Sequence, residues 1–400
     1  MPLEIVSSRL RGFICINAHP VGCAEAVALQ VRRAKENPAT AATASGGNAL
    51  IVGASTGYGL ASWITAAFSA RMGTLGVFLE RPPSEKKTAT AGYYNAGAVL
   101  RMARSEGLRA GAINGDAFSN AVRQEVIEHV RRELGPLDLV VYSLASPVRV
   151  HPDDGRTIRS SLKPVGQPYT TRTIDLDKER LSAITLEPAS PEEIADTVAV
   201  MGGDDLRRWV EALLEAKLLA RGARVLAYSY IGPSLTWPIY RTGTIGQAKA
   251  DLEKTVRALD ARLAGEVSGH AWTSVNAAVV TQASSAIPGV PLYLALIAPI
   301  LEKKGLLERP IDQILRLMKV HAGPGKTPAF DAEGRIRMDD WEMREDVQSV
   351  VAKGWNEVTP ETLTALADLD GFKREFRRLF GFGVPGVDET RPVEIDVPLG

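Results

Sequence analysis

Cysteine and histidine are scarce in this chain of 400 residues. Cys15 and Cys23 are the only cysteines, and two cannot form the disulfide framework of a secreted scaffold in so long a chain. The histidines show neither an HExxH motif nor the paired spacing of a zinc site, so we expect no metal. They are His19, His129, His151, His270 and His321.

The sequence also lacks a net charge and any long apolar run. Lysine plus arginine and aspartate plus glutamate each number 47, so the formal net charge is zero, which argues against a nucleic-acid partner. The apolar run at 290–301 ("VPLYLALIAPIL") is too short to span a bilayer and contains two prolines. The N-terminal residues lack the apolar core of a signal peptide. We therefore expect a cytoplasmic protein without membrane insertion.

What the chain does contain, between residues 49 and 145, is an alternation of short apolar segments and helical periodicity. The segments "ALIVGA", "LGVFLE", "RAGAIN" and "LDLVVYSLA" have the composition of buried strands. Strands that alternate with helices predict a parallel sheet with right-handed crossovers. The predicted fold class is α/β, a Rossmann-type doubly wound sheet similar to that of short-chain dehydrogenases.

The rest of the chain extends this pattern. Residues 146–190 are polar and proline-rich, which predicts an insertion of loops and short hairpins. Further helices and strands follow over 191–330, and "DAEGRIRMDDWEM" (331–343) predicts a small hairpin before C-terminal helices up to residue 400. No repeat and no linker divides the chain. We expect one enlarged Rossmann domain over residues 1–400, with its cofactor half at 49–145.

A glycine-rich turn follows the first predicted strand directly. The sequence "GASTGYG" (53–59) has the spacing G-x-x-x-G-x-G, which short-chain dehydrogenases use. Glycines allow a tight turn in which backbone N–H groups approach a pyrophosphate at the helix N-terminus. The alternative is a turn that only connects strand to helix. The predicted cofactor-binding residues here are Gly53, Ala54, Ser55, Thr56, Gly57 and Tyr58.

The second predicted strand ends at Leu79 and Glu80. A carboxylate at that point accepts hydrogen bonds from the adenosine ribose in dinucleotide-binding folds, which predicts NADH as the cofactor. Arg81 acts in the opposite sense, because an arginine there can accept the 2′-phosphate of NADPH. A solvated acid at a strand end is the alternative.

Residues after the third and fourth predicted strands fall at the same edge of the sheet. Asp116 and Ala117 ("NGDAF") would lie at the adenine ring, and Leu144 and Ala145 ("YSLAS") would flank the middle of the cofactor. Taken alone, each of the four is better explained by a structural role. Their common position at strand carboxyl ends favours a cofactor site.

The segment "IYRTGTIGQAK" (239–249) pairs Tyr240 with Lys249. In one continuous helix these side chains would lie on opposite faces. We expect instead a helix that begins with Thr244 as its N-cap, with Tyr240 on the preceding loop. Lys249 borders the apolar stripe of that helix and needs a partner. A cofactor ribose would supply one, and the ammonium would lower the pKa of Tyr240. A packed tyrosine and a snorkelling lysine are the alternative.

Several specific stretches resemble one known family over nearly the whole chain. They are "CINAHPVGC", "GASTGYGLAS", "GVFLERP", "NGDAFS", "DLVVYSLASPVR", "AYSYIGP", the Tyr-x8-Lys pair, "VVTQASSAIPGVPLYLA" and "IRMDDWEM". They are similar to the FabV-type enoyl-acyl-carrier-protein reductases and the bacterial trans-2-enoyl-CoA reductases. Trp63 and Ala277 depart from the pattern, because an arginine and a lysine are expected there.

The resemblance implies NADH-dependent reduction of the carbon–carbon double bond of trans-2-enoyl thioesters. It implies that Tyr240 donates the proton, that Lys249 binds the cofactor and that Tyr230 contacts the substrate carbonyl. Val279, Val280 and Thr281 would line the nicotinamide. The implied partner is an enoyl thioester on coenzyme A or acyl carrier protein. The carrier and the chain length stay open, and we expect a monomer.

Two other functions remain possible for such a sequence. A ketoacyl or alcohol short-chain reductase could use Ser229 beside a tyrosine, although the Tyr-x8-Lys spacing counts against it. A non-catalytic, NAD-sensing Rossmann module would bind NADH without oxidising it. Turnover of crotonyl and acetoacetyl thioesters distinguishes the three.

Overall fold

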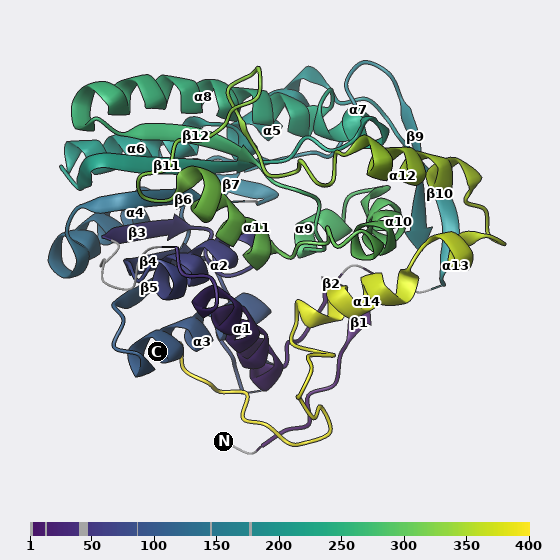
Figure 1. The fold of residues 1–400 in the computed structure, drawn as a ribbon, viewed down its shortest axis with the longest axis horizontal. Helices are drawn as coiled ribbons and strands as arrows, with labels where there is room; N and C mark the ends of the chain where they lie inside the picture. The colour runs from purple at the N-terminus through teal and green to yellow at the C-terminus, as the bar shows by residue number, and fades with distance from the viewer. Residues whose placement is uncertain (1–2, 13, 40–46, 86, 145, 176–177) are drawn as a thin grey trace.

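The computed structural model describes residues 3–12, 14–39, 47–85, 87–144, 146–175 and 178–400. A seven-stranded sheet with the order β13-β12-β11-β6-β3-β4-β5 forms its centre (Figure 1). All neighbouring strands are parallel. The strands are β3 (Asn48–Val52), β4 (Gly73–Phe78), β5 (Ala110–Asn114), β6 (Leu137–Tyr142), β11 (Leu219–Ser229), β12 (His270–Val275) and β13 (Ile336–Arg337). From β3 the strand order proceeds outward to β5 on one side, and from β6 it proceeds outward to β13 on the other. This reversal of the strand order between β3 and β6 confirms the predicted doubly wound topology.

Helices cover both faces of the sheet because the buried strands are apolar on both sides. In β3, Ala49 and Ile51 face a core built with α1 (Pro20–Lys35), α2 (Gly57–Ile64), α3 (Ala91–Ser105) and α11 (Pro310–Leu317). Leu50 and Val52 face the opposite core, built with α4 (Asn120–His129), α6 (Asp204–Glu215) and α8 (Thr244–Val267). Three helices continue into π-helical turns at Thr65–Ser69, Val130–Leu134 and Met318–Ala322.

The polar insertion consists of two antiparallel hairpins, as its composition predicts. They are β7 (Val148–Val150) with β8 (Thr157–Arg159), and β9 (Tyr169–Asp175) with β10 (Arg180–Leu186). The chain then enters α5 (Pro191–Met201), which a serine capping box and a proline at the first turn begin.

A third core lies beside the carboxyl ends of the strands. It joins the short helix α7 (Trp237–Tyr240) to α10 (Val290–Lys303), α12 (Glu345–Glu357) and α14 (Leu369–Arg378). A 3₁₀ turn (Ser234–Thr236), α9 (Gln282–Ser285) and α13 (Leu363–Leu366) complete this region. In Figure 1 these elements lie on the right, next to the β9–β10 hairpin and away from most of the sheet.

The predicted C-terminal hairpin at 331–343 is wrong. Residues 336–337 form β13, which extends the central sheet in parallel with β12. Ile336 is fully buried, and the pairing aligns it with Ser274. The partner strand lies more than sixty positions away in the printed sequence, so a local pattern of alternating residues could not identify it.

The two ends of the described chain meet. The N-terminal residues form the small hairpin of β1 (Leu10–Arg11) and β2 (Ile14–Cys15). Glu4 and Val393 exchange two backbone hydrogen bonds of 2.9 and 2.8 Å, and the Tyr94 hydroxyl on α3 donates to the Ile395 carbonyl at 2.7 Å. In the described part of the chain, no helix combines the length and apolar character that crossing a bilayer requires.

Candidate active site

The glycine turn after β3 has the tight geometry that the sequence predicts. Gly53 and Gly57 adopt φ values of +89° and +53°, a region that favours glycine. A Cβ atom added at Gly53 would lie 2.4 Å from the Ser143 carbonyl oxygen, and one at Gly59 would lie 1.8 Å from the Gly53 oxygen. Larger residues would therefore separate β3, β6 and α2.

The N-terminus of α2 opens at this turn. Thr56 is the N-cap residue, but its side chain forms no capping hydrogen bond, and no acidic residue stands in the first turn. The backbone N–H groups at the start of a helix are an anion-binding site. Ala54 is fully buried under the turn, where its N–H donates to Val77. Tyr58 points elsewhere, since its hydroxyl donates to the Ala277 carbonyl at 2.7 Å.

Glu80 lies at the same turn, two residues after β4 ends at Phe78. Its carboxylate accepts a hydrogen bond of 2.7 Å from the Ser55 hydroxyl. A Cβ atom added at Gly92 on α3 would lie 2.0 Å from the Glu80 Oε1 atom, so that glycine leaves room for the carboxylate. The structure thus brings Glu80 and the glycine turn together. Leu79 is 70% exposed and lies beside them.

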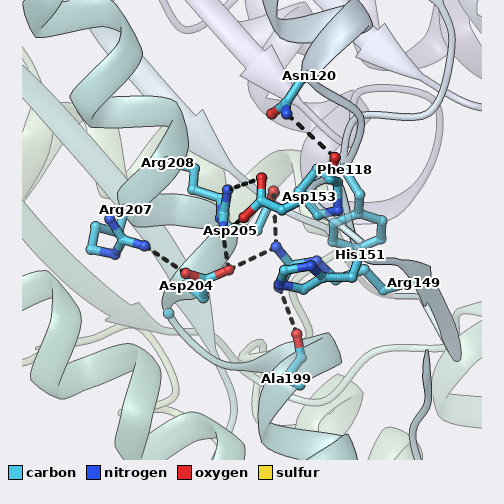
Figure 2. A network of polar contacts seen from close by, with 12 residues as sticks. Phe118, Asn120, Arg149, His151, Asp153, Ala199, Asp204, Asp205, Arg207 and Arg208 are labelled. Carbon is cyan, nitrogen blue, oxygen red and sulfur yellow. Dashed lines mark hydrogen bonds and ion pairs between the residues drawn. The ribbon is translucent and has the colours of Figure 1, made fainter. Parts of the chain in front are cut away.

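The residues expected near the adenine follow β5, and those expected to flank the middle of the cofactor follow β6. The Asp116 side chain accepts from the Phe118 N–H at 3.0 Å, and Ala117 is buried. Arg123 of α4 secures this loop by donating to the Phe118 carbonyl at 2.9 Å and to Asp205 at 2.8 Å. Figure 2 shows the Asp205 cluster beside Phe118.

The fourth strand places Leu144 half-buried, two residues after the end of β6. Ala145, which the sequence places with it, lies outside the described residues.

Tyr240 and Lys249 follow β11 on two consecutive helices. Tyr240 is the last residue of α7, so its predicted loop position is wrong. Thr244 is the first residue of α8 and not its N-cap, which is Gly243. The difference arises because the Thr244 hydroxyl donates outward, to the Ser161 carbonyl of the insertion.

The two glycines between Tyr240 and Lys249 let α7 pack on the start of α8. A Cβ atom at Gly243 would lie 2.3 Å from the Pro238 oxygen, and one at Gly246 would lie 2.1 Å from the Arg241 oxygen. Close backbone approach of this kind requires glycine. The spacing of the pair thus depends on a sharp helix–helix junction.

Lys249 is half-buried at the edge of the apolar stripe, as predicted. Its ammonium donates to the Tyr228 carbonyl at 3.2 Å. Burial lowers the pKa of Lys249 to about 8, although the Glu253 carboxylate raises it. An ammonium has three N–H donors, so donors remain for a ligand at neutral pH. Tyr228 itself is anchored by a 2.6 Å hydrogen bond with Ser62.

The prediction that Lys249 lowers the pKa of Tyr240 is wrong. Burial raises that pKa above its ordinary value, and the Glu342 carboxylate raises it further. The reason is that the Lys249 ammonium points to the Tyr228 carbonyl, whereas an acid is the charged neighbour of Tyr240. At neutral pH the Tyr240 phenol is therefore protonated and able to donate.

Tyr230 stands against Tyr240. Their ring centroids are 4.7 Å apart in an edge-to-face arrangement, with an interplanar angle of 86°. Tyr240 is buried and Tyr230 half-buried. No other described residue forms a hydrogen bond with the Tyr240 hydroxyl, which leaves it available to a ligand.

An acid that the sequence did not single out holds Tyr230. Glu342, which follows β13, is 2% exposed. Its Oε1 atom accepts from the Tyr230 hydroxyl at 3.2 Å and from the Tyr293 hydroxyl at 2.6 Å. Its Oε2 atom accepts from the Ala278 N–H at 2.7 Å. Burial raises the pKa of Glu342 to about 7. In the sequence this residue is the glutamate of "DDWEM". Because that stretch was predicted to form a small C-terminal hairpin, Glu342 was not identified as a site residue.

The segment predicted to line the nicotinamide connects β12 to α9. Val279, Val280 and Thr281 are half-buried there. Thr281 is the N-cap of α9, and its hydroxyl accepts from the Ser284 N–H at 3.0 Å. A Cβ atom added at Gly57 would lie 3.7 Å from the Thr281 methyl carbon, so this segment faces the glycine turn.

The two departures from the family pattern do not change this arrangement. Trp63 is fully buried in α2, and its indole N–H donates to the Thr74 hydroxyl at 3.0 Å. Ala277 acts through its backbone, with its N–H donating to Gln313 at 3.0 Å and its carbonyl accepting from Tyr58.

Three family models match consecutive parts of the chain. Residues 5–85 match the NAD(P)H binding domain of trans-2-enoyl-CoA reductase, and residues 87–321 match the trans-2-enoyl-CoA reductase catalytic region. Residues 330–393 match a model described as the enoyl reductase FAD binding domain.

The segment 330–393 does not fit a flavin dinucleotide. Helices α12 and α14 begin with acidic residues, Glu345 and Asp346 in one and Asp368 and Asp370 in the other, and these repel a pyrophosphate. The Arg337 guanidinium is occupied by the Asp339 carboxylate at 2.7 Å. The segment instead contributes β13 and Glu342 to the site described above.

Relatives match over nearly the full chain. An enoyl-[acyl-carrier-protein] reductase [NADH] of Opitutus terrae is 49% identical over 99% of this chain and 100% of its own. A trans-2-enoyl-CoA reductase of Euglena gracilis is 45% identical over 99% of this chain and 72% of its own.

Solved structures agree with these relatives. The trans-2-enoyl-CoA reductase of Clostridium acetobutulicum in complex with NADH has a TM-score of 0.93 and 38% identity, and that of Treponema denticola in complex with NAD has 0.91 and 44%. Each comparison covers 98% of both chains. The chain therefore belongs to the family of trans-2-enoyl-CoA reductases and NADH-dependent enoyl-[acyl-carrier-protein] reductases.

Proposed function

We propose that this protein reduces the carbon–carbon double bond of trans-2-enoyl thioesters with NADH, giving saturated acyl thioesters in fatty acid synthesis. The observation that carries the proposal is the protonated Tyr240 phenol, free of hydrogen-bond partners among the described residues, at the strand edge that holds the glycine turn and Lys249. The activities that the relatives' names state support the same reaction.

The roles of the residues follow from where charge develops. NADH, when bound, supplies a hydride to the β-carbon of the enoyl thioester. Negative charge then collects on the thioester oxygen, and a donor aligned with that oxygen in a dry pocket stabilises it. Tyr240 is this donor, and Tyr230 contacts the same oxygen. The proton that the α-carbon takes up comes by way of Tyr240.

The same strand edge would hold the cofactor. The α2 N-terminus and the turn at 53–58 would bind the pyrophosphate. Glu80 would accept from the adenosine ribose, and Lys249 would donate to the nicotinamide ribose with its remaining N–H groups. The segment 279–281 would lie against the nicotinamide. Asp116 and Ala117 would lie at the adenine ring, and Leu144 would flank the middle of the cofactor.

The acyl chain would lie against α10. This helix shares a core with Tyr240 and contributes apolar side chains to it, including Leu292 and Ile297. The thioester would be carried by coenzyme A or acyl carrier protein. We further propose that the 400 residues act as one enlarged Rossmann domain, as a monomer in the cytoplasm.

Loss of NADH absorbance in the presence of crotonyl-CoA tests this function. We expect saturable oxidation with crotonyl-CoA and none with acetoacetyl-CoA, because the Tyr-x8-Lys spacing counts against a ketoreductase. Oxidation with acetoacetyl-CoA alone would favour the ketoreductase function. NADH binding without oxidation by either thioester would favour the sensing module. Matched CoA and carrier-protein substrates then identify the carrier.

A further inference from the structure

We propose that Glu342 positions the Tyr230 hydroxyl, and that this hydroxyl can donate to the substrate oxygen only while the Glu342 carboxyl carries a proton. The proposal rests on the proposed function and adds a residue to it. Glu342 does not contact the reacting atoms, so it acts through Tyr230 as a positioning residue.

The geometry fixes where Tyr230 can donate. Its hydroxyl lies 3.2 Å from Glu342 Oε1, and its ring is held edge-on by Tyr240. On the other side, a Cβ atom at Gly232 would lie only 2.7 Å from the Tyr230 oxygen. The hydroxyl is therefore confined between the carboxyl of Glu342 and a glycine that leaves it space.

Counting protons shows why the state of the acid matters. A phenol has one O–H donor. If Glu342 is ionised, its oxygens only accept, and the Tyr230 proton points at Oε1. That proton is then unavailable for a hydrogen bond to the thioester oxygen. Tyr230 could offer the thioester only a lone pair, which repels a developing enolate.

Protonation of Glu342 reverses the direction of this hydrogen bond. Oε2 already accepts from the Ala278 N–H. The Tyr293 hydroxyl accepts from the Gln348 amide at 3.0 Å and donates its own proton to Oε1. A carboxyl proton on Oε1 is therefore best directed to the Tyr230 oxygen. The Tyr230 hydroxyl can then donate a hydrogen bond to the substrate oxygen, and the cluster keeps all of its protons.

The surroundings of Glu342 favour the protonated form. The groups that face it are tyrosines: Tyr58 on α2, Tyr240 on α7, Tyr293 on α10 and Tyr230 after β11. On its own segment the Asp339 carboxylate raises the pKa of Glu342 further, and Gln348 on α12 is neutral. None of the ion pairs among the described residues includes Glu342. With burial as the largest cause, the pKa is about 7.

The pH dependence of kcat/KM with crotonyl-CoA tests the proposal. We expect kcat/KM of the unaltered enzyme to fall by up to tenfold per pH unit above about 7, toward the value of Tyr230→Phe. Glu342→Gln places an amide N–H against Tyr230 at every pH, so this ionisation should disappear. The decline that begins near pH 8 from Lys249 should remain. An ionisation near 7 that persists in Glu342→Gln overturns the proposal.

Two further variants separate positioning from a structural role. Tyr293→Phe removes a hydrogen bond that lowers the pKa of Glu342, so the ionisation should persist and move to higher pH. In a Tyr230→Phe background, Glu342→Gln should leave the pH profile unchanged, because the group through which Glu342 acts is gone. A further change of the profile there contradicts the proposal.

An infrared titration gives a readout without substrate. The unaltered protein should show a carboxylic acid carbonyl band that disappears as the pH rises through about 7, and Glu342→Gln should lack it. If the band is present but crotonyl-CoA is not reduced, the proposed function fails and the ionisation of Glu342 stands. If the band is absent at pH 6, the positioning proposal fails while reduction of crotonyl-CoA can still stand.

Discussion

Two clusters of acidic residues, one around Asp204 and Asp205 and the other around Glu342, differ in their partners. In the first, Asp204 accepts from Arg149 at 2.8 Å and Asp205 accepts from Arg123 at 2.8 Å (Figure 2). In the second, Glu342 meets only hydroxyl and amide groups. Burial raises the pKa of a carboxyl in both places. Guanidinium partners distinguish Asp204 from Glu342, whereas burial keeps the pKa of the deeper Asp205 above its ordinary value although Arg123 and Arg149 lower it.

The pKa values follow this difference. Burial raises the pKa of Asp204, but hydrogen bonds from Arg149, Arg207 and Arg208 outweigh it and leave the pKa below its ordinary value. Glu342 has no such partner, and its pKa stays at about 7. The first cluster is a structural brace, which ties the adenine-side loop and the insertion to α6 through Arg123 and Arg149. The second can change protonation near neutral pH.

The largest expected effect is the loss of kcat when the proposed proton donor Tyr240 is removed. Tyr240→Phe should lower kcat by roughly 10²- to 10⁴-fold, the usual range for removing a proton donor, while the NADH dissociation constant stays unchanged. Steady-state kinetics and calorimetry measure the two quantities. Tyr94→Phe is the matched control, because it removes a buried hydroxyl that, among the described residues, hydrogen-bonds only to the backbone of Ala89 and Ile395 and should leave kcat unaffected. A near-normal kcat for Tyr240→Phe would remove Tyr240 from the mechanism.

Disrupting the brace formed by Asp204, Asp205 and their arginines should lower the free energy of unfolding without altering the pH profile of turnover. Arg123→Met leaves Asp205 buried without its closest cation, a change that costs about 3–5 kcal/mol in such sites. Urea unfolding measures this loss. Arg132→Met, which removes an exposed pair with Glu133, should cost much less. A pH profile displaced by Arg123→Met as strongly as by Glu342→Gln would abolish the distinction between the clusters.

The stability of the folded chain should itself depend on pH through Glu342. Its pKa is about 7 when folded, against an ordinary value of 4.5. The folded state therefore holds a proton that the unfolded state releases between these values. The free energy of unfolding should fall as the pH rises through this window, by about 3 kcal/mol in total. Urea unfolding at pH 5 and pH 8 should show this contribution in the unaltered protein and not in Glu342→Gln.

Lys249 is expected to act on the cofactor more than on the acid clusters. A hydrogen bond to a charged group contributes about 1.5–3 kcal/mol, so Lys249→Met should weaken NADH binding roughly 10- to 150-fold. Calorimetry with NADH measures this, and Lys254→Met on the same helix is the control. Unchanged affinity in Lys249→Met would return the lysine to the snorkelling alternative.

The smallest expected effect is on cofactor choice. Glu80→Ala removes a carboxylate that would repel the 2′-phosphate of NADPH and would accept from the ribose of NADH. The ratio of kcat/KM for NADH over NADPH should fall by roughly tenfold, or about 1.4 kcal/mol. Arg81 should leave some NADPH use in the unaltered enzyme, more at low salt. A ratio that stays constant would make Glu80 an ordinary strand-end acid.

The sequence predicted those parts of the molecule whose pattern is local. The central-sheet strands β3, β4, β5, β6, β11 and β12 contain short apolar segments, and the glycine turn and Glu80 follow two of them directly. The same logic found Tyr240 and Lys249, since the glycines between them indicate a junction of two elements. These features need no knowledge of distant residues.

What the sequence did not predict depends on contacts between remote segments. Glu342 lies about a hundred positions from Tyr230 and Tyr240 in the printed sequence, and "DDWEM" has the polar look of a surface turn. The sign of the Tyr240 pKa shift was missed for the same reason. Because Lys249 is close to Tyr240 in the sequence, we predicted that its positive charge would lower the Tyr240 pKa. In the fold, burial and the Glu342 carboxylate raise that pKa instead.

The position of β13 has a consequence for the timing of synthesis. Residues up to 330 contain six of the seven strands of the central sheet, but the edge of β12 gains its neighbour only when Ile336 and Arg337 emerge. Glu342 emerges immediately afterwards. A nascent chain released before this point would carry the glycine turn, Tyr240 and Lys249, yet its sheet edge would be open and Tyr230 would have no acid beside it. The segment from Ile336 to Glu342 thus completes the site, so full activity requires translation to proceed past Glu342.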